Sequence, residues 1–276
     1  MRTSGAMARR LMFRPWPGSA RRAGQALCLW LVTCVASAPL MAAGSGADGT
    51  GQSNPGWTDE IFSAEFARPT TAYAHGVLGD AVEWAWLTYS YRGKDQVPRA
   101  LEIRLPADHV FEDLKPRLVD LNLDGRANAV MVVETDMAGG AALALYGAGG
   151  KIAETPHIGR RNRWLAPIGA ADLDGDGHVE IAYVDRPHLA RTLRIWRFQS
   201  GELREVAAWS GLTNHRIGDD FITSGLRSCG SGPELVLVDA QWQSLVAARL
   251  VAGQIEIRVI APFTGTASLE AALSCQ

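Results

Sequence analysis

Two nine-residue segments with the same pattern of acidic, amide and glycine residues constrain the fold of this chain more than any other feature. They read DLNLDGRAN at 120–128 and DLDGDGHVE at 172–180, and each leads directly into a short apolar run. Carboxylates at alternate positions of a tight turn repel one another, so such a turn needs a compensating charge. Two copies of one pattern, 52 residues apart, also indicate a chain built from repeats.

The apolar runs recur in register with these segments. Aligning Glu83, Asn128, Glu180 and Glu234 gives spacings of 45, 52 and 54 residues. Each unit holds about four short runs rich in Val, Ile, Leu, Tyr and Trp, separated by turn residues, and no long helical period stands out. Units of four strands at this length are typical of propeller blades. The sequence therefore predicts an all-β fold, a small β-propeller of about four or five four-stranded blades.

The predicted blades lie within a repeat domain that spans 57–276. Four of them are expected, at roughly 68–114, 115–160, 161–213 and 214–263. One blade cannot bury both faces of its sheet, so neighbouring blades must pack against it. The segment 60–69 could supply a strand that closes the ring with the last blade. A fifth, degenerate blade and an open stack of sheets are the alternatives.

The N-terminal 43 residues have the features of a secretory signal. Six arginines and no acidic residue come before an apolar run that ends in small residues. An uncleaved membrane anchor is the alternative. The polar segment 44–56, rich in Gly and Ser, is interpreted as a flexible leader. We therefore expect a periplasmic or secreted protein with no membrane span after signal cleavage.

Removal of the signal changes the charge balance and the cysteine count. The 27 basic residues fall to 21 against 29 acidic ones, which gives a net charge of −8. This charge argues against nucleic acid and against anionic membrane surfaces as partners. Only Cys229 and Cys275 remain of the four cysteines. In an oxidising compartment we expect them to form a disulfide, and two unpaired thiols are the alternative.

The two acidic segments have the spacing of a calcium loop. Oxygen-bearing side chains fall at positions 1, 3, 5 and 9, glycine at position 6 permits a sharp turn, and position 7 would offer its backbone carbonyl. Hard oxygen ligands in this number suit Ca²⁺, whereas Mg²⁺ prefers to keep its waters. The expected ligands are Asp172, Asp174, Asp176, His178 and Glu180 in one loop, and Asp120, Asn122, Asp124, Arg126 and Asn128 in the other.

An EF-hand is excluded by position 12. It requires Glu there, and the chain has Met131 and Tyr183. Asx turns that need no metal are the alternative explanation of the acidic residues. The loop at 172–180 has four carboxylates, and the loop at 120–128 has two carboxylates and two amides. We therefore expect Ca²⁺ to bind more tightly at 172–180, with a structural role in which binding stabilises the fold.

The stretch PIGAADLDGDGHVEIAYV resembles an FG-GAP repeat, as found in integrin alpha-chain propellers and in bacterial VCBS-type repeat proteins. The match covers two of the predicted blades well and the other two weakly. The resemblance implies a β-propeller with Ca²⁺ in the blade loops, carried here by Asp172, Asp174, Asp176, Glu180 and their counterparts from Asp120. Integrin propellers have seven blades and partner subunits, and neither feature follows for this chain.

Two polar loops carry the remaining candidate chemistry. No G-x-S-x-G, H-E-x-x-H or C-x-x-C motif is present. The five histidines beyond the loop at 172–180 fall in separate loops and are interpreted as surface or loop-packing residues. On one face of a propeller, loops converge near the central channel, where an Arg/His/Asp cluster would bind an anionic ligand or perform acid–base chemistry. The candidate ligand loops contain Asp185, Arg186, His188, Arg191, His215, Arg216 and Asp219.

These observations favour a calcium-stabilised extracytoplasmic binding or protein-interaction module over an enzyme. Its expected partner is a protein or a glycan, and the chain is expected to be a monomer. The alternative is a propeller hydrolase or lyase whose site is built from loops 185–191 and 214–220. Convergence of Asp185, His188, His215 and Asp219 on one cavity would favour the enzyme. Salt bridges and turn hydrogen bonds dispersed over the rim would favour the binding module.

Overall fold

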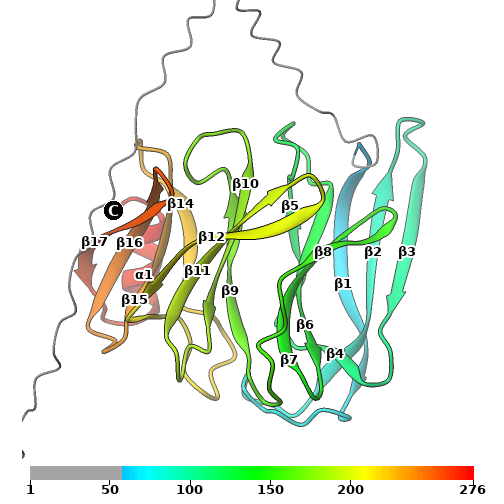
Figure 1. Ribbon diagram of the computed structural model, residues 1–276, viewed down its shortest axis with the longest axis horizontal. Coiled ribbons are helices and arrows are strands. Elements are labelled where there is room, and N and C mark those ends of the chain that lie inside the picture. Colours follow the sequence, from blue (N-terminus) through cyan, green and yellow to red (C-terminus); the bar gives the residue numbers. More distant parts are fainter. Residues whose placement is uncertain (1–57) are drawn as a thin grey trace, which may run out of the picture. The chain divides into compact units, whose positions relative to one another are not determined.

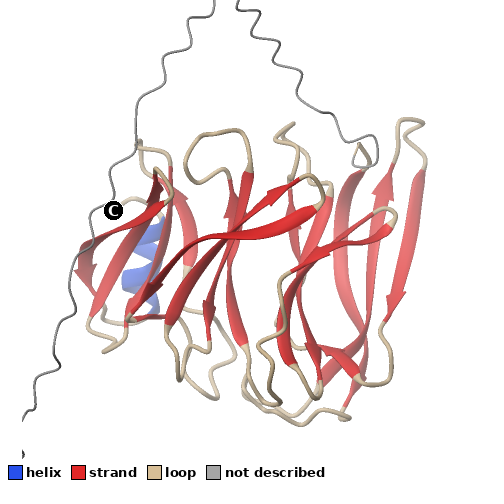
Figure 2. Ribbon diagram, in the orientation of Figure 1, coloured by secondary structure: helices blue, strands red, loops and turns tan. Residues whose placement is uncertain are grey.

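The computed structural model describes residues 58–276, so the predicted signal and the predicted leader both lie outside the described residues. Strands dominate the described part of the chain, and they form three antiparallel sheets with one short helix (Figures 1 and 2). The all-β prediction is therefore confirmed. Within the described residues, no helix has the length and the apolar character needed to cross a bilayer.

The first sheet has eight strands and contains the strands of the first two predicted blades. Its main path runs β1-β2-β4-β6-β7-β8, while β3 pairs with β2 and β5 pairs with β6. The short strand β4 joins the two halves, because it pairs with both β2 and β6. The strands are β1 (Glu60–Thr70), β2 (Glu83–Arg92), β3 (Pro98–Arg104), β4 (His109–Phe111), β5 (Arg117–Val119), β6 (Ala129–Asp136), β7 (Gly140–Gly147) and β8 (Gly150–Glu154).

The other two sheets correspond to the third and fourth predicted blades. The second sheet has the order β12-β11-β10-β9, and the third has the order β13-β15-β16-β17 with β14 also paired to β15. Their elements are β9 (Leu165–Ala171), β10 (Val179–Asp185), β11 (Thr192–Gln199), β12 (Glu202–Ser210), β13 (Leu212–Thr213), β14 (Gly225–Ser228), β15 (Pro233–Asp239), β16 (Ser244–Val251) and β17 (Gln254–Pro262), followed by α1 (Thr266–Leu273).

Two apolar layers hold the sheets together. The first contains Met131 and Leu143 of the first sheet and Ile181 of the second. The second contains Val184 and Ile195 of the second sheet with residues of the third. Strands β6, β7 and β10 are buried along almost their whole length, because apolar side chains pack against both of their faces. This burial explains why these segments read as continuous apolar runs rather than alternating ones.

The predicted ring-closing strand has a different partner. Residues 60–70 form β1, which pairs along its length with β2 and not with the last sheet. The first sheet instead contacts the third through residues 71–82, the loop that connects β1 to β2, which we call the strap. Figure 1 shows this connection running along the lower edge of the sheets. The strap reaches the third sheet at Val77, whose carbonyl accepts a hydrogen bond from the N–H of Gly218 at 3.2 Å.

The strap depends on a glycine at its closest approach. Gly79 has φ +93°, and a Cβ at this position would lie 2.8 Å from the carbonyl oxygen of Gly218. Only glycine accepts both the left-handed backbone and this separation without a shift of the backbone. Val77 and Tyr73 bury their side chains beside this point. The strap is therefore a packed part of the fold and not a loose loop.

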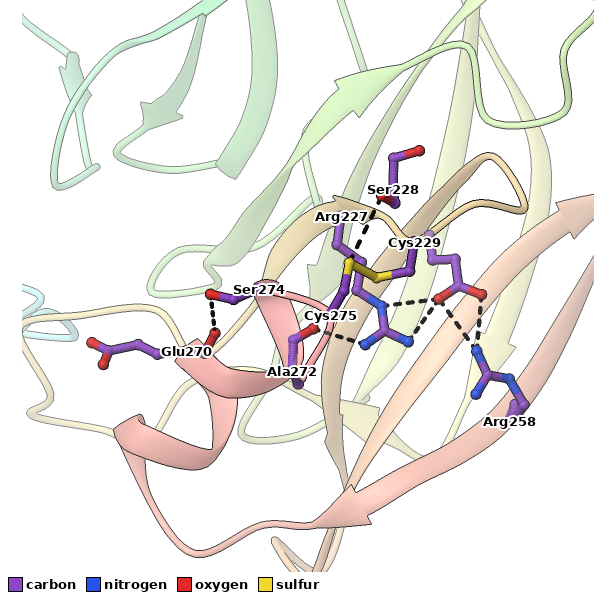
Figure 3. Close-up of a disulfide and its surroundings, with 9 residues drawn as sticks. Arg227, Ser228, Cys229, Arg258, Glu270, Ala272, Ser274 and Cys275 are labelled. Atoms are coloured by element: carbon purple, nitrogen blue, oxygen red, sulfur yellow. Dashed lines mark hydrogen bonds and ion pairs between the residues drawn. A yellow bond between two sulfur atoms is a disulfide. The ribbon is translucent and has the colours of Figure 1, made fainter.

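The C-terminal helix is fixed to the third sheet by a disulfide. Cys229 and Cys275 are bonded, so the predicted pairing is confirmed. Leu269 and Ala272 of α1 pack on Val236 of β15. Figure 3 shows the disulfide beside Arg227, which donates a hydrogen bond to the carbonyl of Ala272. The helix thus covers part of one face of the third sheet.

Candidate functional site

The loop at 172–180, called the 172 loop, is organised around the carboxylate of Asp172. Its Oδ1 accepts hydrogen bonds from the N–H groups of Gly175 and Asp176, at 2.7 and 3.1 Å, and its Oδ2 accepts one from Gly177 at 3.0 Å. Gly175 and Gly177 have φ +78° and +86°, the left-handed conformation that glycine adopts without strain. The alternating glycines therefore allow the backbone to wrap around one acidic side chain.

Three of the predicted ligands converge in this loop. Asp172, Asp174 and Asp176 each present a carboxylate oxygen, and these three oxygens lie within 4.8 Å of one another. Oδ1 of Asp174 is buried and has no hydrogen-bond partner among the described residues. Asx turns account for the bonds of Asp172, but they leave this oxygen unexplained. A donor set of hard oxygens with one buried, unpartnered member fits Ca²⁺.

Arg197 of β11 lies beside the same carboxylates. Its Nε lies 2.6 Å from Oε1 of Glu180, its Nη2 lies 2.6 Å from Oδ2 of Asp174, and its Nη1 lies 2.5 Å from Oδ2 of Asp176. Register explains the contact, because Glu180 and Arg197 are direct partners across β10 and β11. Burial would raise the pKa of Asp176, but hydrogen bonds from His178 and the charge of Arg197 lower this pKa below its ordinary value.

The side chain at position 9 anchors the loop. Oε2 of Glu180, a fully buried residue, accepts a hydrogen bond from the N–H of Leu173 at 2.8 Å. Glu180 is not among the three acidic residues whose oxygens lie within 4.8 Å of one another. At position 7, the ring of His178 contacts Asp176 and Gln199. The structure thus groups positions 1, 3 and 5, and uses position 9 to close the base of the loop.

The loop at 120–128, called the 120 loop, has the same frame with fewer charges. Asp120 accepts the N–H of Gly125 at 2.7 Å, and Asp124 accepts the N–H of Arg126 at 2.9 Å. The amide of Asn122 donates to Asp124 at 3.1 Å. Asn128 accepts the N–H of Leu121 at 2.8 Å, the counterpart of the bond between Glu180 and Leu173. The loop frame therefore repeats, although only two of its side chains are acidic.

In the first and last units the acidic residues aligned with Glu180 are Glu83 and Glu234. Glu234 is neutralised by arginines, whereas Glu83 has no cationic partner among the described residues. Glu234 forms ion pairs with Arg227 at 2.8 Å and with Arg258 at 3.0 Å. Arg227 is the direct partner of Glu234 on β14. Glu83 is buried, and no arginine or lysine within residues 58–276 forms an ion pair with it. Burial, followed by the charge of Glu112, raises the pKa of Glu83 to about 9, so this side chain is neutral at pH 7.

The predicted ligand loops are only partly brought together. Nε2 of His188 lies 3.0 Å from Nδ1 of His215, whose own Nε2 donates to the backbone carbonyl of Asp219 at 2.9 Å. The carboxylate of Asp185 is instead held by Arg186 and Arg194. The two remaining residues of the set lie elsewhere: Arg191 donates to the carbonyl of Ala240, and Arg216 stacks on Trp242. The side chains whose convergence would favour an enzyme therefore do not meet in one cavity. They are those of Asp185, His188, His215 and Asp219.

The histidines are less dispersed than their positions in the sequence suggest. His215 lies in a loop and is buried against Trp164, which agrees with its interpretation as a loop-packing residue and not a surface one. Burial, followed by the proximity of His215, lowers the pKa of His188 to about 4. His75 of the strap bonds the buried Glu112 at 2.5 Å and lines a cavity of about 30 Å³ together with His188. The sequence gives no local signal for this grouping, because the strap brings His75 in from the first sheet.

Any functional assignment rests on the contacts described above, because comparisons with known proteins found no match. No family model matches the chain, and no curated protein matches it.

Proposed function

We propose that the chain is a calcium-stabilised extracytoplasmic repeat protein of the FG-GAP/VCBS type, acting as a binding or protein-interaction module. The observation that carries this proposal is the convergence of Asp172, Asp174 and Asp176 within 4.8 Å together with the buried, unpartnered Oδ1 of Asp174. Like charges at this separation destabilise a turn, and the single charge of Arg197 beside the four carboxylates leaves a need for further positive charge. A hard divalent ion with several oxygen ligands meets that need.

The residues that would hold the ion are the three aspartates and the backbone carbonyl of His178. When bound, Ca²⁺ would supply two positive charges and would link the loop tip to the strand that follows. Asp172 would keep the hydrogen bonds that shape the turn. Glu180 would keep the base of the loop closed through Leu173. The role of the ion is structural, because its binding free energy would add to the free energy of folding.

The repeat interpretation is supported by the four aligned positions. Glu83, Asn128, Glu180 and Glu234 are all buried polar residues at or next to the start of a central strand. Buried polar groups are costly unless they are partnered, so four of them at one register position indicate a shared construction. We propose that the units from β5–β8, β9–β12 and β14–β17 are blades of the propeller type. The strap and α1 then take the place of the contacts that a closed ring would make.

Binding is favoured over catalysis by the ligand loops. A hydrolase or lyase site in loops 185–191 and 214–220 would need free carboxylates beside the two histidines. Asp185 is committed to Arg186 and Arg194, and Asp219 contributes its backbone carbonyl to His215. We therefore propose a protein or glycan as the partner of a monomeric module that is periplasmic or secreted.

Calorimetric titration with Ca²⁺ tests the metal assignment. The secreted form should bind Ca²⁺, and Asp174→Asn should weaken the tighter binding step by at least about ten-fold, which corresponds to about 1.4 kcal/mol. Asp220→Asn serves as the matched control, since Asp220 lies in the corresponding loop of the last unit but is not one of the clustered aspartates. Equal binding by Asp174→Asn and the wild type would overturn the proposed site.

A further inference from the structure

The guanidinium of Arg197 contacts three of the four carboxylates in the 172 loop, at separations of 2.5–2.6 Å. We propose that Arg197 is the residue that sets the calcium affinity of this loop, because its guanidinium is a tethered cation that Ca²⁺ must displace. This inference rests on the proposed calcium function and adds a regulator of the same site.

The contacts of Arg197 engage two of the three carboxylates that a metal would also bind. Nη2 holds Oδ2 of Asp174, and Nη1 holds Oδ2 of Asp176. Both aspartates belong to the cluster whose oxygens lie within 4.8 Å of one another. A guanidinium donates in a fixed planar fork and stays protonated, so it cannot yield these oxygens by losing a proton. Calcium that takes both oxygens of these aspartates, and not only the free Oδ1 of Asp174, therefore has to break the two ion pairs.

The fold gives Arg197 a place to remain when it is displaced. Its Nε is bonded to Oε1 of Glu180, and Glu180 is its direct partner across the two strands. Because Glu180 lies outside the three-aspartate cluster, this pair does not compete with a metal. The side chain of Arg197 is 20% exposed, so its Nη groups have access to water after displacement. Rotation about the end of the side chain would release both aspartates while the pair with Glu180 persists.

Charge explains why a tethered cation is useful in this loop. Asp172, Asp174, Asp176 and Glu180 carry four negative charges when ionised, and in the absence of a metal Arg197 removes part of their repulsion. The 172 loop would then keep its shape without calcium, but its affinity for calcium would be lower because Arg197 competes for the same carboxylates. Within the described residues the 120 loop has no counterpart of Arg197, because the facing strand β7 ends at Gly147. Arg197 therefore makes the difference in calcium affinity between the 172 loop and the 120 loop smaller than the carboxylate counts alone predict.

Calcium titration of Arg197→Gln tests the proposal. The variant should bind Ca²⁺ at the 172 loop at least about ten-fold more tightly than the wild type, a change of about 1.4 kcal/mol. In the presence of chelator its melting temperature should be lower than that of the wild type. Arg197→Lys, which keeps the charge without the planar fork, should lie between the two. Arg194→Gln is the matched control, because Arg194 is on the same strand and pairs with Asp185 and Glu205 instead.

The outcomes separate this inference from the proposed function. Tighter binding by Arg197→Gln with unchanged binding by Arg194→Gln would support the tethered cation. Equal or weaker binding by Arg197→Gln would overturn it and leave the calcium site standing. Absence of binding by the wild type, Arg197→Gln and Arg197→Lys would overturn both. The ¹⁵Nη signal of Arg197 gives a second measurement if the variant folds poorly, because the Nη groups and not Nε leave their partners. In the wild type this signal should shift with added Ca²⁺, and a signal that stays unchanged while Ca²⁺ binds would also overturn the displacement.

Discussion

The backbone N–H of Leu173 donates a hydrogen bond of 2.8 Å to Oε2 of Glu180, and this bond closes the base of the 172 loop. Leu121 and Asn128 make the equivalent bond in the 120 loop, also at 2.8 Å. Both acceptors are buried. Position 9, which the spacing of a calcium loop predicts to be a metal ligand, therefore accepts a structural hydrogen bond within each loop. One loop uses a carboxylate and the other an amide for the same task.

Asn128→Ala should destabilise the fold by about 1–3 kcal/mol, because it leaves the N–H of Leu121 without its acceptor in a buried place. Urea unfolding measures the change. In chelator, where no metal ligand is lost, Asn122→Ala at the exposed tip of the same loop is the control and should change stability much less. If the two variants proved equally stable, the anchoring role of position 9 would be wrong.

The pH dependence of stability should reveal Glu83. In the folded chain its pKa is raised to about 9 from an ordinary value of 4.5, so the unfolded chain binds fewer protons at this residue between those two pH values. Its contribution to stability therefore falls as the pH rises through this window, and it is fully present only below it. Glu83→Gln removes the ionisation and should be more stable than the wild type near the alkaline end. Thermal melts across the window measure the difference.

The difference between Glu83→Gln and the wild type should shrink toward the acidic end of the window, where Glu83 is protonated in both folded and unfolded chains. Glu65→Gln, at an exposed position of β1, should show no such trend. A constant difference at every pH would contradict the assignment of a neutral, buried Glu83.

Loss of the disulfide should weaken the attachment of α1. Cys229 and Cys275 close a loop with a sequence separation of 46. On the chain-entropy model, the double replacement of both cysteines by alanine should cost about 3–4 kcal/mol of stability. Denaturant unfolding under non-reducing conditions checks this value. Reduction of the wild type should reproduce most of the loss, and a reduced protein as stable as the oxidised one would show that packing of Leu269 and Ala272 holds the helix without the bond.

Sequence reasoning recovered the features that depend on local pattern. The apolar runs became strands, the cysteines paired, and the acidic loops lie before β6 and β10 as expected. It missed contacts that depend on long-range pairing. The strand β4 joins two predicted blades, and β1 pairs with β2 instead of the last sheet, because pairing partners are set by packing over the whole fold.

Arg197 was missed for a related reason. It lies 17 residues after Glu180 and faces it only because β10 and β11 form a hairpin in that register. Counting outward from the turn at 186–191 would have paired these two residues and revealed a cation beside the loop. The strap and its His75 had no such signal, since a loop without regular structure gives no period to count.

Thermal unfolding with and without calcium tests the central claim most directly. The wild type should melt at a higher temperature in Ca²⁺ than in chelator, and Asp174→Asn should lose most of this shift. Ligand binding to the folded state alone raises stability in this way. An identical melting temperature for the wild type in Ca²⁺ and in chelator, at saturating Ca²⁺, would contradict the claim that the clustered aspartates hold a calcium ion.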